Sequence, residues 1–260
     1  MRHLIKLLSV LFVLSFAQTA WAACVVNGTS YKTIGGSGTK VTRPEMLSWG
    51  TGDVSTCDVT DSSLNDMSDL FKNKTNFDQD LSAWDTSSVT DMGYMFYNAT
   101  SLTSVTLPQT GNVLTMISMF FNTTSLTSVS LPTTGAVTNM TNMFFNATAI
   151  SSVYLPKTGE VTNMSIMFYR ATALTSVTLP TTGAVTDMSY MFGYATAISS
   201  VSLPKTGAVT DMSSMFERAT AIESVNLPET SSVTDMSYMF YRASAFNQDI
   251  RGLDVSDVTN

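Results

Sequence analysis

The sequence predicts a repeat solenoid, a stack of similar coils in which each coil packs on its neighbours. A block of 24 residues recurs along most of the chain. Three kinds of residue keep this step: a methionine column from Met92 to Met236, a phenylalanine column from Phe96 to Phe240, and a proline column from Pro108 to Pro228. A fixed period between about 20 and 50 residues is the sequence signature of stacked repeats.

Residues 1–22 are expected to form an export signal. Arg2 and Lys6 supply a positive start, residues 7–16 form a short apolar core, and Ala20-Trp21-Ala22 is a cleavage site of small residues. The apolar run is too short to span a bilayer, and no later run is longer, so no membrane span is expected. The sequence therefore predicts an exported protein at the cell surface, in the medium or in the periplasm.

The chain contains two cysteines, Cys24 and Cys57. An even number of cysteines in an exported chain predicts a disulfide, here one that ties the mature N-terminus to the segment before the repeats. Two alternatives stay open at this point. The cysteines could remain free thiols, or Cys24, which follows the cleavage site closely, could carry a lipid.

Residues 23–60 do not match the repeat and are expected to form an N-terminal cap on the first coil. Within them, residues 35–38 (Gly-Gly-Ser-Gly) indicate a loop, and Pro44 is suited to open a short helix.

Residues 61–260 are expected to form the solenoid, with about eight coils of 24 or 25 residues. In one coil, Leu174, Val177 and Leu179 have the spacing of a short strand with apolar residues on one face. The apolar residues of the run 185–192 then recur at steps of three, three and one, which indicates a short helical or 3-10 turn. One short strand and one such turn per coil make a leucine-rich-repeat-like solenoid.

Two segments carry a more specific resemblance. Residues 233–243 (Val-Thr-Asp-Met-Ser-Tyr-Met-Phe-Tyr-Arg-Ala) and 246–250 (Phe-Asn-Gln-Asp-Ile) resemble the BspA-like leucine-rich-repeat surface proteins, whose mycoplasma-type variant carries a domain of unknown function. The resemblance extends over about residues 61–260. It implies an exported or surface-displayed protein, and it implies adhesion, because some members bind proteins of a host or a neighbouring cell. It implies no catalytic motif and no cofactor.

Charge and composition exclude several classes of function. The chain has 13 basic and 20 acidic residues, and loss of Arg2 and Lys6 with the signal changes the formal net charge from −7 to −9. Such an acidic chain argues against nucleic acid and anionic membranes as partners. The only histidine, His3, lies in the predicted signal, and no nucleotide-binding or hydrolase motif is present. We therefore expect no enzymatic activity.

Two columns invite a metal-site interpretation. The methionines could bind Cu(I), but no histidine or cysteine column accompanies them, so we interpret them as core residues. A polar column precedes the first methionine of each unit and could bind calcium. It offers one short side chain per coil where calcium needs six to eight oxygens, so turn capping or a hydrogen-bond ladder is expected instead. This column contains Asp66, Asp91, Thr115, Asn139, Asn163, Asp187, Asp211 and Asp235.

The candidate binding face consists of aromatic and arginine side chains just after the phenylalanine column. Exposed aromatic residues and arginine are favoured at protein interfaces, although partial burial against the next coil is an equal alternative. The candidate residues are Tyr97, Phe121, Phe145, Tyr169, Arg170, Tyr194, Arg218, Tyr241 and Arg242.

The alternative face lies on the strands, where small hydroxyl residues flank the inward valine. Stacked strands lie about 4.8 Å apart, so these residues would form a flat array that could bind glycan, protein or, remotely, ice. It could equally be a plain solvated face. The residues are Ser104, Thr106, Ser128, Ser130, Ser152, Tyr154, Ser176, Thr178, Ser200 and Ser202.

The function expected from these features is adhesion or scaffolding through a rigid repeat face that recognises an extracellular protein or glycan. The alternative is a structural protein that assembles with itself. The sequence shows no recognisable cap after residue 258, which would leave an apolar end available for end-to-end association.

Overall fold

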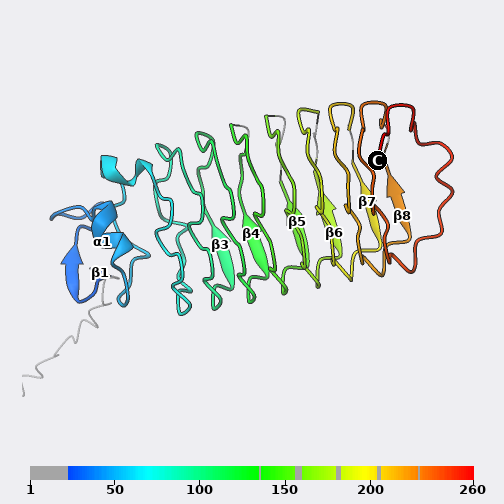
Figure 1. Ribbon diagram of the computed structural model, residues 1–260. Helices are drawn as coiled ribbons and strands as arrows, with labels where there is room; N and C mark the ends of the chain where they lie inside the picture. The colour runs from blue at the N-terminus through cyan, green and yellow to red at the C-terminus, as the bar shows by residue number, and fades with distance from the viewer. Residues whose placement is uncertain (1–22, 135, 156–159, 180–182, 204–205, 228) are drawn as a thin grey trace, which may run out of the picture.

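The computed structural model describes residues 23–134, 136–155, 160–179, 183–203, 206–227 and 229–260. The predicted export signal lies outside this part of the chain, as do Pro156, Pro180, Pro204 and Pro228 of the proline column. Figure 1 shows the coils stacked side by side in one row, with the N-terminal unit at one end and the C-terminus at the other. The fold is a repeat solenoid of the leucine-rich-repeat type.

The N-terminal unit contains an antiparallel hairpin, β1 (Cys24–Val26) and β2 (Thr29–Tyr31), followed by the short helix α1 (Arg43–Leu47). The hairpin turn is Asn27-Gly28, and both residues have positive φ, 49° and 83°, as a tight hairpin turn of this composition requires. Pro44 stands in the first turn of α1, as expected. The Glu45 carboxylate accepts a hydrogen bond from the Thr42 backbone N–H at 2.6 Å and so caps the helix.

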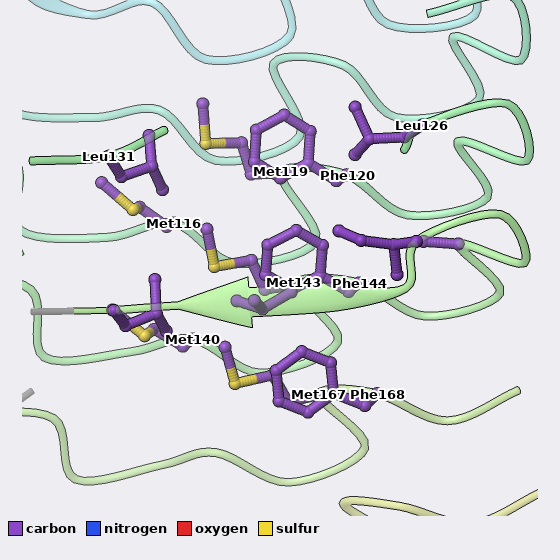
Figure 2. Packing of buried hydrophobic residues seen from close by; sticks show 14 of the residues in the cluster. Met116, Met119, Phe120, Leu126, Leu131, Met140, Met143, Phe144, Met167 and Phe168 are labelled. Atoms are coloured by element: carbon purple, nitrogen blue, oxygen red, sulfur yellow. The ribbon is translucent and has the colours of Figure 1, made fainter. Parts of the chain in front are cut away.

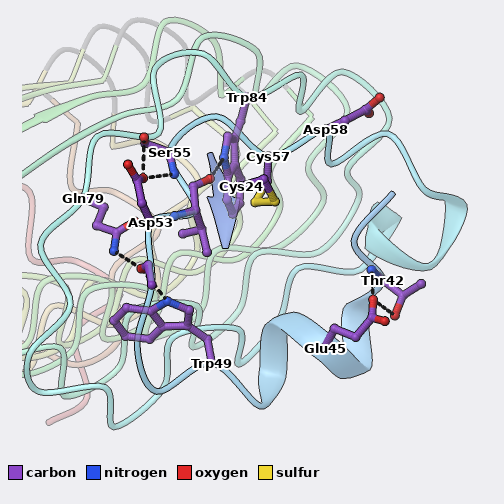
Figure 3. The surroundings of a disulfide bond; sticks show 12 residues. Cys24, Thr42, Glu45, Trp49, Asp53, Ser55, Cys57, Asp58, Gln79 and Trp84 are labelled. Atoms are coloured by element: carbon purple, nitrogen blue, oxygen red, sulfur yellow. Dashed lines mark hydrogen bonds between the residues drawn. A yellow bond between two sulfur atoms is a disulfide. The ribbon is translucent and has the colours of Figure 1, made fainter. Parts of the chain in front are cut away.

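The predicted disulfide is confirmed: Cys24 is bonded to Cys57, and both residues are fully buried (Figure 3). The bridge joins β1 to the segment that leads into the repeats. The sulfur of Cys24 is thereby used, so in this oxidised form it carries neither a free thiol nor a lipid.

Side chains of the first coil hold this unit in place. The Gln79 amide accepts a hydrogen bond from the Val54 N–H at 2.8 Å and donates one to the Gly52 carbonyl at 2.7 Å. The Trp84 indole N–H donates to the Val54 carbonyl at 2.9 Å (Figure 3). The Trp49 ring packs edge-on against Phe77, with ring centroids 5.2 Å apart. The N-terminal unit and the solenoid therefore share one continuous core.

Six successive repeats each contribute one short strand with a central inward-facing valine. Paired strands lie parallel and in register one coil apart, as in Val105 opposite Val129. The 3-10 helix η1 (Ser62–Asn65) precedes them in the first coil. The strands are β3 (Ser104–Thr106), β4 (Ser128–Ser130), β5 (Ser152–Tyr154), β6 (Ser176–Thr178), β7 (Ser200–Ser202) and β8 (Ser224–Asn226), which pair as β3–β4, β5–β6 and β7–β8.

The methionine–phenylalanine segment of each coil alternates two kinds of backbone hydrogen bond. In one coil, the Asn142 N–H donates to the Ser165 carbonyl of the next coil, and the Phe144 N–H donates to the Met167 carbonyl. The intervening Phe145 N–H donates within its own coil to the Asn142 carbonyl, three residues back. Half of the N–H groups therefore join neighbouring coils while the other half close local turns.

The expected short helical or 3-10 turn takes the form of these consecutive turns. Their local bonds span three residues, as in a 3-10 helix. However, Asn142 and Asn146 have φ of 57° and 55°, in the left-handed region, and the same two positions are left-handed in every coil. These residues turn alternate N–H groups away from the helical direction and toward the next coil.

The core consists of continuous columns of buried side chains. The methionines of both columns are buried from Met67 to Met215, which supports the interpretation of them as packing residues. The phenylalanine rings stack along the solenoid, with centroids 5.3 Å apart between Phe120 and Phe144 and 5.5 Å apart between Phe144 and Phe168 (Figure 2). Each coil thus covers the apolar surface of the one before it.

The polar column before the first methionines forms a second parallel ladder of isolated bridges, which runs from Asp66 to Asp235. Its side chains serve the local turns: Asp187 accepts from the Ser189 N–H at 2.9 Å, and Asp211 accepts from the Ser213 N–H at 2.8 Å. These contacts support the capping interpretation.

Asparagine side chains form another ladder at the second left-handed position. The Asn122 amide donates to the Asn98 side-chain oxygen at 2.9 Å, and the Asn146 amide donates to the Asn122 oxygen at 2.6 Å. Asparagine suits this position twice, because it tolerates left-handed backbone and can bond to its copies.

We predict that Asn122→Ala and Asn122→Gly both destabilise the protein, with alanine the worse by about 1 kcal/mol. Both variants lose the side-chain ladder, but only alanine adds the penalty for a Cβ at positive φ. Denaturant midpoints measure the difference. Equal midpoints for the two variants would contradict the assigned backbone conformation.

A second prediction concerns Asp58, whose carboxylate lies 2.7 Å from the Lys32 ammonium. Burial raises the pKa of Asp58, but hydrogen bonds from Lys32 and Thr60 and the lysine charge outweigh it and lower the pKa to about 2. Because the unfolded pKa is about 3.9, Asp58 stabilises the fold above pH 4, and this contribution of about 2 kcal/mol is lost as pH falls to 2.

Stability measured against pH tests this. Asp58→Asn should remove part of the loss of stability between pH 4 and pH 2, whereas Asp53→Asn, an exposed residue with a similar local turn, should leave it in place. An unchanged slope in Asp58→Asn would refute the assignment.

Candidate binding face

The consecutive turns carry three columns of residues along one side of the solenoid, which together we call the turn face; all of them reach the surface except Ser118, Gly193 and Ser214, which are buried. The first column occupies the first left-handed position and the third column the second. The second column directly follows the buried phenylalanines. In chain order the columns are Tyr94, Ser118, Asn142, Ile166, Tyr190, Ser214 and Tyr238; Tyr97, Phe121, Phe145, Tyr169, Gly193, Glu217 and Tyr241; and Asn98, Asn122, Asn146, Arg170, Tyr194, Arg218 and Arg242.

Four of the predicted aromatic residues stack on one another along the middle column. Ring centroids are 4.5 Å apart between Tyr97 and Phe121, 4.4 Å between Phe121 and Phe145, and 5.2 Å between Phe145 and Tyr169, with planes within 14° of parallel. These rings are half-buried, because their faces cover each other and their edges point outward. Both expectations for them therefore hold in part: they are packed between coils and also reach the surface.

The stack ends at Gly193. A Cβ there would lie only 2.7 and 2.9 Å from ring carbons of Tyr169, so the Tyr169 ring covers the place that a side chain would take. Tyr194 and Tyr190 lie beside the same ring, tilted by 54° and 63° at centroid distances of 5.1 and 6.3 Å. The regular stack thus gives way to an irregular tyrosine cluster. Burial raises the pKa of Tyr169, which keeps its phenol neutral.

Arginine replaces asparagine beside this cluster. The Arg170 guanidinium lies 5.7 Å from the Tyr169 ring centre and 5.5 Å from that of Tyr194, and Arg218 lies 5.2 Å from Tyr194. These are cation–π distances. Arg218 also lies 3.8 Å from the Glu217 carboxylate, whereas no carboxylate of the described residues pairs with Arg170.

A hollow of about 370 Å³ opens at this point, lined by Phe145, Ile166, Tyr169, Arg170 and Tyr190. The sequence prediction includes three of these residues and misses Ile166 and Tyr190. Ile166 has a signal in the sequence, because it is the one aliphatic residue of its column, whereas Tyr190 has none, because Tyr94 and Tyr238 occupy the same column.

The remaining predicted residues lie elsewhere on the turn face. Tyr97 and Phe121 belong to the stack, away from the hollow. Tyr194 and Arg218 flank it through the tyrosine cluster. Tyr241 and Arg242 lie two coils beyond Tyr194, where the arginine is 5.2 Å from the tyrosine ring centre.

The residues of the alternative hydroxyl face lie at the exposed positions of β3 to β7. The flanking residues, from Ser104 and Thr106 to Ser200 and Ser202, are exposed around the inward valines. Tyr154 is the exception to the small side chains and has 62% of its surface exposed.

In the described part of the chain, no group of three or more histidine, cysteine, aspartate or glutamate residues is arranged to hold a metal ion. Among the same residues, no helix is long and apolar enough to cross a bilayer.

The repeats match a known family, described as "Mycoplasma protein of unknown function, DUF285", over residues 46–157, 103–203 and 186–260. The chain belongs to this family. The match begins inside the N-terminal unit and includes all of the turn face. No curated protein matches the chain significantly.

Solved structures similar to this DUF285 protein include a chain of the Toll–Spatzle complex of Drosophila, with 15% identity over 67% of this chain and a TM-score of 0.38. The present chain covers 23% of that one. The T. pallidum leucine-rich-repeat protein TpLRR has 16% identity over 60% of this chain and 70% of its own length, with a TM-score of 0.33.

We predict that Gly193→Ala destabilises the protein by about 1–2 kcal/mol and displaces the Tyr169 ring, because the added Cβ overlaps it. Denaturant midpoints and near-ultraviolet circular dichroism report the two effects. Gly111→Ala is the matched control, since its Cβ would have an ordinary contact of 3.5 Å. Equal stability of the two variants would contradict the close packing of Tyr169 on Gly193.

Proposed function

We propose that this DUF285 protein is an exported, extracellular binding protein that docks another protein on its turn face, in the manner of an adhesin or interaction scaffold. The Cys24–Cys57 disulfide supports a location outside the reducing cytoplasm. The predicted signal at residues 1–22 supports export.

The observation that carries the proposal is the departure from the repeat around Gly193. In the preceding coils the middle column stacks ring on ring and the asparagines beside it form a ladder, so these contacts serve the stack itself. At Gly193 the ring stack ends, Arg170 stands where the preceding coils have asparagine, and a hollow opens beside Tyr190. Tyrosine and arginine around a hollow are the residues that most often carry binding energy at protein interfaces.

The strand face supports a weaker alternative, the binding of glycan or protein to the hydroxyl array. It is flat and carries one large aromatic side chain, Tyr154, so it offers many shallow contacts and no anchor. Ice binding is weaker still, because Tyr154 interrupts the regular array. End-to-end self-assembly stays a prediction from sequence.

A binding screen on immobilised extracellular matrix proteins and glycans tests the proposal. The repeats themselves supply conservative variants: Arg170→Asn and Tyr190→Ser place residues that occur in the same columns at Asn146 and Ser214. We expect the double variant to weaken a protein interaction about 10-fold to 100-fold, the loss of one or two interface anchors.

Two control variants distinguish binding at the hollow from a general effect of charge and from binding at the strand face. Arg251→Asn removes the same charge from an exposed residue outside the turn face and should bind like the wild type. Ser176→Lys obstructs the strand face and should also leave binding intact. If Ser176→Lys abolishes binding while the double variant does not, the partner uses the strand face and the proposal is wrong.

A further inference from the structure

The hollow beside Tyr169 has a charge opposite to that of the protein as a whole. The chain is acidic, with a formal net charge of −7. Three of its six arginines, Arg170, Arg218 and Arg242, nevertheless occupy one column of the turn face. Of these, Arg170 lines the hollow, is exposed, and has no carboxylate partner among the described residues.

The aromatic wall of the hollow reinforces this positive character. One face of the Phe145 ring is covered by Phe121 and the other by Tyr169, and the Tyr169 ring is covered in turn by Gly193. The faces of the Phe145 ring are thus occupied by other rings and are closed to stacking of a sugar, while ring edges carry partial positive charge. Ring edges and a guanidinium together favour a carboxylate.

The same hollow can also bind an apolar side chain of a partner. Ile166 and Tyr190 line it from the same column of two neighbouring coils, and both are partly exposed. A volume of about 370 Å³ lies within the range of small-ligand pockets, so it can accept one large side chain.

The backbone holds these groups in fixed positions. Ile166, Tyr190 and Arg170 are all left-handed, with φ of 61°, 56° and 60°. Their N–H groups donate to the next coil, at 2.8 Å to Ser189, 2.9 Å to Ser213 and 2.8 Å to Gly193 respectively. The site is therefore preorganised by the solenoid, which lowers the entropy lost on binding.

We infer that the hollow anchors an acidic peptide segment of the partner protein, in which an aspartate or glutamate stands next to a large apolar residue. The carboxylate pairs with Arg170, and the apolar side chain enters between Ile166 and Tyr190. This inference rests on the proposed function and adds to it the chemistry of the partner.

Two synthetic peptides, blocked at both ends, test the inference against the purified full-length protein. One contains Ser-Gly-Asp-Phe-Gly-Ser and the other Ser-Gly-Asn-Phe-Gly-Ser, so that they differ in one negative charge. Binding is followed by NMR shifts of the Arg170 and Tyr190 signals, with oligogalacturonate as an anionic sugar probe. We expect the aspartate peptide to bind at least about 10-fold more tightly, the difference made by one charge-assisted contact.

Arg170→Asn should abolish this preference, and Arg251→Asn, at an exposed residue outside the turn face, should retain it. Equal binding of the two peptides, no binding of either, or a preference that survives in Arg170→Asn would overturn the inference. Binding of oligogalacturonate alone would assign the hollow to an anionic sugar and overturn it as well.

These outcomes are separable from those of the proposed function. If the double variant at Arg170 and Tyr190 loses a protein partner while the peptides show no charge preference, the docking face stands and the acidic anchor falls. If the peptides discriminate but no protein partner depends on the hollow, the docking proposal falls.

Discussion

The alternation of hydrogen bonds in the turn segments is the constraint on which the rest of the structure depends. Every second N–H of this segment donates to the next coil, and the others close local turns. This pattern requires two left-handed residues per coil at fixed positions. Once these positions are fixed, equivalent side chains of successive coils must lie one above another. Each set of equivalent positions is then readily occupied by a column of like residues that pack on or bond to each other.

The residue type of each column depends on whether the column lies in the core, at a left-handed position or on the surface. Inside, methionine and phenylalanine fill the space between coils without a polar group to satisfy. At the left-handed positions, asparagine tolerates the backbone and bonds to its copies on either side. Outside, aromatic rings cover each other's faces. The last two columns lie on the surface, so a substitution there changes the exterior while the core columns remain intact.

Glutamine side chains take the place of strand pairing at both ends of the repeat array. Gln79 bonds to the backbone at Val54 and Gly52, and Gln248 bonds to both the N–H and the carbonyl of Val225 in β8. An amide side chain offers one donor and one acceptor in the geometry of a peptide group, so it can satisfy a strand edge where no strand follows. We propose on this basis that the unit at residues 23–60 acts as the N-terminal cap.

Periodicity makes the fold predictable from the sequence. Because a solenoid repeats one local structure, the inward residues, the strand positions and the coil number follow from the 24-residue step, and the disulfide follows from the cysteine count. The positions with a left-handed backbone were harder to predict from the sequence, because residues such as Tyr94, Ile166 and Arg170 seldom indicate a positive φ. The role of Gln248 was equally hidden, because the motif Phe-Asn-Gln-Asp identifies an atypical repeat without indicating which backbone its amide contacts.

The candidate site was predictable only in part, because residue type alone does not tell whether an aromatic side chain serves the stack or lines a surface hollow. Tyr169 and Arg170 attract attention by residue type, but Phe121 does so equally and proves to be a member of the stack. What separates the two cases is Gly193, which has no ring to continue the stack, so that Tyr169 is the last ring of the series and lines the hollow. In a repeat protein, a column that keeps the same residue type in every coil is explained by the packing of one coil on the next. A position where several columns change together is not required by the stack, and it is there that selection for a partner can act without loss of the fold.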